Sequence, residues 1–166
     1  MPVLDSIPHG LGVFVDANIL VYALLNQSTQ CLRFLNMCSQ GSVAALTTTH
    51  VINETTHRLM IYEAYNKGII TKATAAALKV KPHEIKGLQH YWTQIELIFD
   101  LGIQIVDVHR EVLLEAQRVR LASGLMTNDS IVVAVMHMHA ISTLASADAD
   151  FDLVAGLVRY APDDLA

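Results

Sequence analysis

The sequence places an aspartate between an apolar strand and an apolar helix in the stretch Val13-Phe14-Val15-Asp16-Ala17-Asn18-Ile19-Leu20. The β-branched and aromatic residues before Asp16 favour a short buried strand. The residues from Asn18 to Leu25 predict a helix that starts directly after it. Asp16 therefore stands at the carboxyl end of the first strand, where its side chain either caps the helix or serves a site.

Strand and helix patterns alternate along the rest of the chain. Further strands are predicted at residues 42–46, 103–108, 141–145 and 157–160. Helices are predicted at 30–39, about 50–65, 71–79, 82–99 and 111–122, whereas the apolar run 131–139 suits a helix or a strand equally. This alternation predicts a three-layer α/β/α fold around a central, mostly parallel sheet of four to five strands.

Length and composition predict one compact domain that spans residues 1–166. The chain has 166 residues, the length of a single domain, and 52% of them are hydrophobic. Because no apolar run approaches the ~20 residues of a membrane span and the first residues lack a signal-peptide pattern, we expect a cytoplasmic protein without membrane contact. Cys31 and Cys38 share one face of a predicted helix and are expected to be buried thiols.

Charge is distributed unevenly along the chain, whose net charge is −5. The segment from Asp129 to the end carries six acids and one base, whereas residues 67–86 carry five lysines and a single acid, Glu84. An acidic end and a basic middle fit a cation site beside a surface that tolerates phosphates. A solvated helix face is the alternative explanation of the lysines.

Four acids are expected to converge at one edge of the sheet. Asp16 and Asp148 follow strands, and Glu54 and Asp129 lie in first turns of predicted helices that leave the carboxyl edge, where parallel sheets form their functional crevice. Because like charges repel, such a cluster is stable only when protons or cations neutralise it. Oxygen ligands without cysteine select Mg²⁺ or Mn²⁺, and a bound metal makes hydroxide available for attack on phosphorus.

Each of these acids also has a purely structural explanation. Asp16 and Asp129 stand where helix caps are favoured, and Glu54 lies on a partly polar helix face. Asp148 alternates with Asp150 and Asp152, of which at most one or two can point inward. The joint placement of the acids, and no single one of them, predicts the metal site.

Four stretches resemble the motifs of PIN domains, and they occur in the same order between Val13 and Tyr160. They are Phe14-Val15-Asp16-Ala17-Asn18-Ile19-Leu20, Ile52-Asn53-Glu54, Asn128-Asp129-Ser130-Ile131-Val132-Val133-Ala134 and Ser142-Thr143-Leu144-Ala145-Ser146-Ala147-Asp148-Ala149-Asp150-Phe151. The resemblance implies catalytic, metal-binding roles for Asp16, Glu54, Asp129 and Asp148. It implies that Asp150 is an outer metal contact or a cap that fixes the loop, and it implies supporting roles for Asn18 and Ser146. It also implies that residues 131–139 form a helix.

The size of the chain resembles that of stand-alone VapC-type toxins of VapBC toxin–antitoxin pairs. This resemblance implies an Mg²⁺- or Mn²⁺-dependent endoribonuclease that cleaves RNA and is inhibited by an antitoxin protein. The apolar composition predicts a homodimer, because one small core need not cover every apolar helix. The interval between Glu54 and Asp129 is long, which predicts an enlarged helical pair at about 71–99. The alternative is a catalytically silent PIN-like module that binds RNA or protein.

Overall fold

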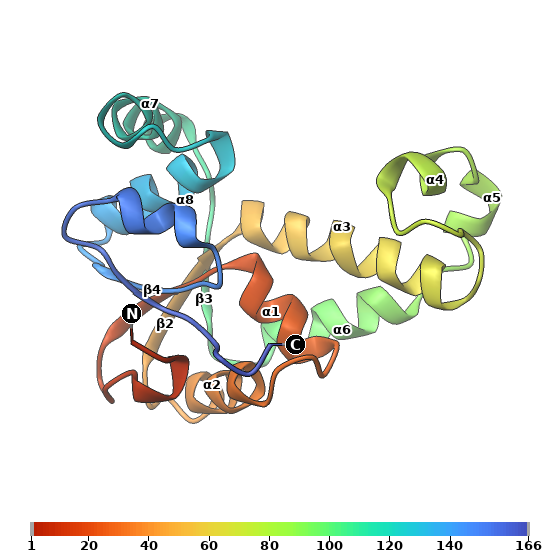
Figure 1. The fold of residues 1–166 in the computed structure, drawn as a ribbon, viewed down its shortest axis with the longest axis horizontal. Coiled ribbons are helices and arrows are strands. Elements are labelled where there is room, and N and C mark those ends of the chain that lie inside the picture. The colour runs from red at the N-terminus through yellow and green to blue at the C-terminus, as the bar shows by residue number, and fades with distance from the viewer. Residues whose placement is uncertain (1, 166) are drawn as a thin grey trace.

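The computed structural model describes residues 2–165 and shows a five-stranded sheet with helices on both faces (Figure 1). The strands are β1 (Gly12–Val15), β2 (Ala44–Thr48), β3 (Gln104–Val106), β4 (Thr143–Ala145) and β5 (Val158–Tyr160). Their order across the sheet is β3-β2-β1-β4-β5, and each neighbouring pair is parallel. The predicted three-layer α/β/α fold is therefore confirmed.

The helices form two groups on opposite faces of the sheet. They are α1 (Ala17–Leu24), α2 (Thr29–Ser39), α3 (Thr49–Asn66), α4 (Ala75–Lys79), α5 (Pro82–Ile85), α6 (His90–Phe99), α7 (Arg110–Ser123) and α8 (Thr127–Met138), with short 3-10 turns at Leu4–Ser6 (η1) and Ala149–Leu153 (η2). Helices α7 and α8 pack together on one face, and α1 and α2 pack together on the other (Figure 1). Helices α3 and α6 run side by side away from the sheet.

The order of the strands creates a crevice between β1 and β4. From β1 the chain builds the sheet outward through β2 to β3, then crosses back to add β4 and β5 on the other side. A parallel sheet opens at the carboxyl ends of the two strands where this direction reverses. Val15 pairs with Ala145 at that point, so the next residues, Asp16 and Ser146, leave the sheet side by side.

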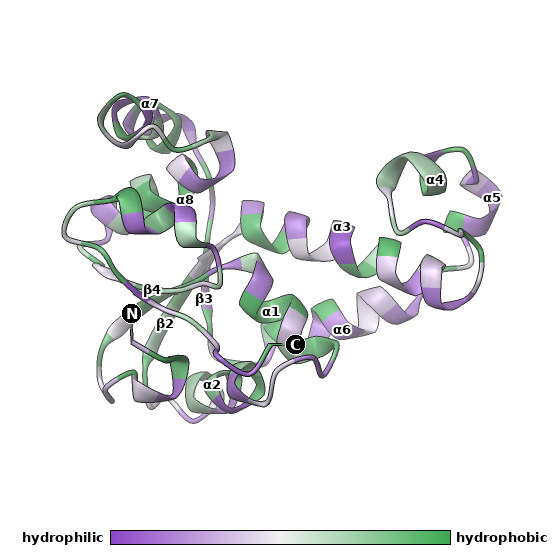
Figure 2. Cartoon of the chain, in the orientation of Figure 1, coloured by the Kyte–Doolittle hydropathy of each residue, from purple (hydrophilic) through white to green (hydrophobic). Residues whose placement is uncertain are grey.

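The core explains why the run 131–139 was ambiguous from its pattern. Residues 131–136 form the middle of α8, and all six are buried. A helix that is covered on every side shows no amphipathic period, so its pattern cannot be told from that of a buried strand. Cys31 and Cys38 are buried free thiols on α2, as predicted, and burial raises the pKa of Cys38 to about 12. Figure 2 shows apolar residues gathered along α1 and α8.

The prediction of one helix over 82–99 is wrong. Helix α5 ends at Ile85, and α6 begins at His90. The carboxylate of Glu63, a buried residue of α3, accepts hydrogen bonds from the backbone N–H of Gln89 at 3.2 Å and of Tyr91 at 2.8 Å. These donors lie at the start of α6, where backbone N–H groups lack partners within the helix. A residue distant in sequence therefore decides where α6 begins.

Residues 67–89, which we call the helical arm, project from the far ends of α3 and α6 (Figure 1). The arm contains α4 and α5 and lies, with α6, in the range where an enlarged helical pair is expected. A small second core, separate from the main one, joins it to the end of α3 through Ala64, Ile70, Leu78 and Leu88.

No single helix within residues 2–165 is long and apolar enough to cross a membrane. The pair α7 and α8 passes the same length and composition test only jointly, with a bend of 110° between them.

Candidate active site

Asp16 lies at the carboxyl end of β1 and is almost completely buried. Its backbone N–H donates to the carbonyl oxygen of Ala145 at 3.1 Å and so extends the β1–β4 ladder by one bond. Its Oδ1 accepts a hydrogen bond from the backbone N–H of Ala17 at 2.7 Å and thereby caps α1. The capping explanation therefore holds for one carboxylate oxygen and leaves the second oxygen for other contacts.

That second oxygen, Oδ2, belongs to a network that joins the ends of β1 and β4. It accepts hydrogen bonds from Ser146 Oγ at 2.6 Å and from Asn18 Nδ2 at 2.5 Å. Ser146 Oγ in turn accepts from the backbone N–H of Asp148 at 3.0 Å, and Asn18 Oδ1 accepts from the backbone N–H of Ala147 at 3.0 Å. The structure thus places both predicted supporting residues beside Asp16, where they fix the orientation of its carboxylate.

The environment of Asp16 raises the pKa of its carboxyl group. Burial is the largest cause, because it disfavours the charged form. The hydrogen bonds from Ser146 and Ala17 oppose this effect, and the negative charges of Glu54 and Asp148 add to it. Two other predicted site acids are therefore near enough to influence Asp16 electrostatically.

Asp129 lies in the first turn of α8 and is partly buried. The helix-capping explanation does not apply to it, because the N-cap residue of α8 is Met126 and no side chain caps that end. The pKa of Asp129 is raised to about 6, first by burial and then by the charges of Asp148, Asp16, Asp150 and Glu54. Every other predicted metal ligand therefore acts on this one carboxyl group.

Glu54 lies on α3 and is partly buried. Arg58 follows it by one helical turn, with its Nη1 3.8 Å from Glu54 Oε1. This distance is too long for a hydrogen bond, and an exposed pair of this kind contributes little free energy, so Glu54 remains free to meet a cation. Arg58 is not among the residues predicted from the sequence, although the spacing of four residues on one helix indicates such a pair.

The three aspartates after β4 have different environments. Asp148 is exposed and caps η2 by accepting from the backbone N–H of Asp150 at 2.9 Å. Asp150 is also exposed. Asp152 instead accepts two hydrogen bonds from the buried Arg159, from Nε at 2.9 Å and from Nη2 at 2.7 Å, and this guanidinium lowers the pKa of Asp152.

Arg159 also donates to the backbone carbonyl oxygen of Ser146 at 3.3 Å. The Asp152–Arg159 pair therefore braces the segment that carries Ser146 and Asp148. Sequence reasoning missed this pair, because an aspartate in a row of three gives no sign of which arginine it meets.

The chemistry of the donor set fits a hard divalent cation. The predicted ligands are all carboxylates, which suit Mg²⁺ and Mn²⁺. A cation would remove the repulsion that raises the pKa of Asp129, so the cluster favours its binding. Within residues 2–165, no three histidine, cysteine, aspartate or glutamate side chains are already grouped as metal ligands. The exact ligand set stays a prediction.

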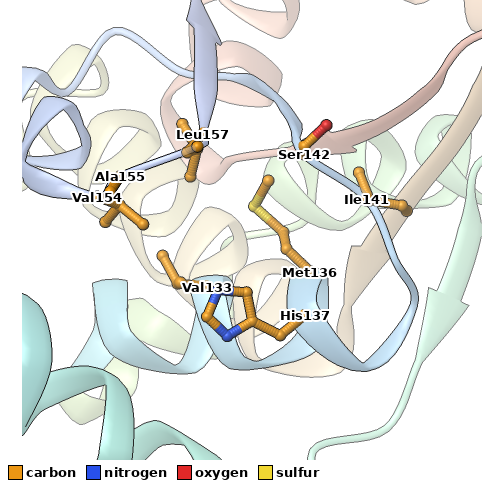
Figure 3. Close-up of a pocket in the computed structure, with 9 residues that line it drawn as sticks. Val133, Met136, His137, Ile141, Ser142, Val154, Ala155 and Leu157 are labelled. Atoms are coloured by element: carbon orange, nitrogen blue, oxygen red, sulfur yellow. The ribbon is translucent and has the colours of Figure 1, made fainter.

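A small pocket of about 150 Å³ lies at the opposite edge of the sheet. Figure 3 shows Ser142 and Leu157, which precede β4 and β5, and Val133, Met136 and His137, which come from α8. This pocket lies at the amino ends of the strands, whereas the acids follow their carboxyl ends. It therefore does not belong to the acidic site.

The fold and the crevice define a parallel α/β protein with clustered carboxylates at the point where its sheet changes direction. A family model described as the PIN domain matches residues 13–157, and the chain belongs to the PIN domain family. None of the curated proteins compared with the chain matches it.

Three solved structures share the fold at low sequence identity. VapBC2 from Rickettsia felis, bound to a DNA fragment from its promoter, has a TM-score of 0.62 and 14% identity and covers 92% of this chain and 99% of that chain. VapC20 from Mycobacterium tuberculosis, described as a sarcin-ricin loop cleaving toxin, has a TM-score of 0.57 and 16% identity, with 88% and 96% covered. A toxin–antitoxin complex from Klebsiella pneumoniae has a TM-score of 0.54 and 15% identity, with 88% and 95% covered.

Proposed function

We propose that this protein is an Mg²⁺- or Mn²⁺-dependent endoribonuclease and the toxin of a VapBC-type toxin–antitoxin pair. The observation that carries the proposal is the clustering of acids at the crevice, where burial and then the charges of four other carboxylates raise the pKa of Asp129 to about 6. Membership of the PIN domain family supports the assignment. The likeness of its fold to proteins described as VapBC2, as a sarcin-ricin loop cleaving toxin and as a toxin–antitoxin complex supports the toxin role.

In this proposal the carboxylates of Asp16, Glu54, Asp129 and Asp148 hold the metal, with Asp150 as an outer contact. The metal, when bound, lowers the pKa of a water molecule and offsets charge on the leaving oxygen of the RNA. Asn18 and Ser146 keep Asp16 Oδ2 in one orientation through the bonds described above. Asp129, whose pKa is about 6, is mostly charged above pH 6, so a cation meets a carboxylate there and keeps it deprotonated at lower pH.

The proposal includes a cellular setting. Residues 1–166 form a single domain in the cytoplasm, and an antitoxin protein inhibits it. A homodimer is supported by the exposed apolar side chains of α7, which include Leu113, Leu114 and Leu121. Exposed apolar residues that share one helix mark a surface for protein association more often than isolated ones do.

The test is an RNA cleavage assay on the purified chain with Mg²⁺ or Mn²⁺. The parent protein is expected to cut RNA, excess EDTA to abolish cutting, and Asp16→Asn to be inactive. Asp100→Asn is the matched control, because Asp100 is an exposed residue at the end of α6 and should tolerate the same change. Full cleavage in excess EDTA would show that the reaction does not need a metal. A fully active Asp16→Asn protein would show that Asp16 does not belong to the active site.

A second assay tests the toxin role. Expression of the parent chain without a partner gene is expected to slow growth, whereas expression of the Asp16→Asn chain is not. If the purified chain cuts RNA but its expression does not slow growth, the proposed nuclease activity stands and the proposed toxin role is wrong.

A further inference from the structure

Every lysine of the chain lies in the helical arm. The five lysines are Lys67, Lys72, Lys79, Lys81 and Lys86. Glu84 is the only acid between 67 and 86, so this segment carries a net charge of +4 and leaves −9 on the rest of a chain whose total is −5. The positive charge is therefore concentrated on one projecting element.

Most of this charge is not neutralised within the protein. Among the described residues, Lys67 forms an ion pair with Glu63, whereas Lys72, Lys79, Lys81 and Lys86 are exposed and form none. Four of the six arginines, Arg33, Arg58, Arg118 and Arg159, pair with an acid, so that among the described residues only Arg110 and Arg120 form no ion pair. The arm is thus the main source of available positive charge on an acidic protein.

The arm is held in a defined position by contacts that do not involve these four lysines. Its buried residues Ile70, Leu78 and Leu88 pack with Ala64 of α3. The Glu63 carboxylate accepts bonds from the first backbone N–H groups of α6, which closes the base of the arm. A surface held in this way presents its charges to a partner at lower entropic cost than a flexible loop would.

Helix α3 connects the arm to the acidic crevice. Glu54 lies near the start of α3 and Lys67 follows its last residue, which places them about 20 Å apart along the helix at 1.5 Å per residue. Between them, His57 and Lys79 line the same cavity of about 490 Å³, formed where α4 lies over α3. The arm and the crevice therefore lie at opposite ends of α3.

We propose that the helical arm binds the sugar-phosphate backbone of the RNA substrate at a distance from the cleavage point. This inference rests on the proposed function. The rest of the chain, which contains the crevice, carries a net charge of −9 and repels a polyanion unless positive groups elsewhere hold the strand. Lysine contacts to phosphates supply affinity and position without reading sequence, so the arm sets where RNA lies and not which base is cut.

The test compares two triple variants with the same loss of charge, each made in the Asp16→Asn background so that RNA stays uncut. Lys72, Lys79 and Lys86 are replaced by glutamine in one, and Arg33, Arg110 and Arg118 in the other. Binding of a labelled single-stranded RNA of about 16 nucleotides is followed over a range of salt concentrations. The plot of log affinity against log salt is expected to lose about 0.7 in slope per lysine, about 2 in all, and the arginine variant should lose little.

Cleavage assays on the same triple variants, made without the Asp16→Asn substitution, separate an effect on RNA binding from an effect on the chemical step. The lysine variant should cut an RNA of about 4 nucleotides as fast as the parent does, and a long RNA with a raised KM. Equal salt slopes for the two triple variants, or no measurable RNA binding by the parent, would overturn the inference, as would an arm that binds only an acidic protein. If the parent protein binds RNA through these lysines but never cuts it, the proposed nuclease activity is wrong and the proposed RNA binding by the arm stands.

Discussion

Ser146 Oγ donates a hydrogen bond of 2.6 Å to Asp16 Oδ2 across a sequence separation of 130 residues. The bond spans the gap between β1 and β4, where the sheet changes direction, and the serine is completely buried. Because Ser146 Oγ also accepts from the backbone N–H of Asp148, one hydroxyl group connects two of the proposed metal ligands. Its orientation is therefore coupled to both of them.

Replacing Ser146 by alanine should weaken the site without removing an acid. Loss of a group that orients a metal ligand commonly reduces metal affinity or activity about 10–100-fold. We expect a loss in this range, measured as Mn²⁺ affinity by calorimetry and as RNA cleavage. Ser123→Ala is the control, because the Ser123 hydroxyl bonds only within its own helix end, to Val119 O and Leu125 N. An Mn²⁺ affinity equal to that of the parent would show that Asp16 does not need this bond.

Asp129→Asn should raise the thermal stability of the metal-free protein at pH 7.5. The charged form of Asp129 is repelled by the other acids, and asparagine relieves this repulsion. Partial exposure of the residue reduces the effect to about 1 kcal/mol, which corresponds to a rise in Tm of about 2–4 °C. Asp100→Asn serves as the control for the loss of one negative charge, and a fall in the Tm of Asp129→Asn would contradict the prediction.

The gain from Asp129→Asn should depend on pH in a defined direction. The folded pKa of about 6 lies above the ordinary value of 3.8, so the folded state binds the proton more tightly than the unfolded state does. Stability of the parent therefore falls as pH rises from about 4 to 6. The difference in Tm between variant and parent should be largest above pH 6 and vanish below about pH 4, which a series of melting curves would reveal.

Metal binding should stabilise the folded protein by mass action. A ligand at 100 times its Kd stabilises a folded protein by about 2.7 kcal/mol. Saturating Mn²⁺ is therefore expected to raise the Tm of the parent by several degrees, EDTA to reverse the rise, and Asp16→Asn to abolish it. An equal rise in both proteins would place the bound Mn²⁺ outside the crevice.

The aspartates after β4 should respond differently to substitution. Asp148→Asn should reduce cleavage, whereas Asp152→Asn should leave most of it and lower Tm, because Asp152 is engaged by Arg159. Leaving the buried Arg159 with an uncharged partner costs about 1–2 kcal/mol, or roughly 2–8 °C. Loss of activity in Asp150→Asn with none in Asp148→Asn would move the fourth ligand to Asp150.

The sheet and its crevice could be predicted from the sequence because their signals are local. Short apolar strands alternate with helical patterns and so define the parallel sheet, and the acids that follow the first and fourth strands place Asp16 and Asp148 at one edge of it. The family resemblance predicted that residues 131–139 form a helix. Their hydrophobic pattern could not show this, because a helix that is buried on all sides has no amphipathic period. Asp129 emerged as a site residue from the joint placement of acids, not from its own surroundings.

What the sequence could not predict depends on contacts between distant residues. The break between α5 and α6 arises from Glu63, and the bracing of the segment after β4 arises from Arg159. Both are single charged side chains that meet backbone atoms of another segment, 13 to 28 residues away. Propensity and periodicity carry no information about such pairs.

Glu63→Gln should loosen the base of the helical arm. Desolvation of the buried Glu63 carboxylate disfavours its charged form and raises its pKa. The hydrogen bonds from Lys67, Tyr91 and Gln89 outweigh this effect and lower the pKa. Its stabilising effect is therefore present above pH 4.5, the ordinary value, and is lost as pH falls through the lowered pKa. Glutamine keeps the shape but leaves these donors with a weaker acceptor, at a cost of about 1–3 kcal/mol.

The expected fall in Tm at pH 7 is about 2–12 °C, and it should shrink toward zero in strong acid, where the parent glutamate is itself neutral. Hydrogen exchange should quicken at the amide of Tyr91 and across residues 67–89, because opening of the arm no longer breaks a bond to a charged group. Glu84→Gln is the control, since Glu84 is an exposed acid of the same arm. An unchanged exchange rate at Tyr91 in Glu63→Gln would show that packing of Ile70, Leu78 and Leu88 holds the arm without the carboxylate.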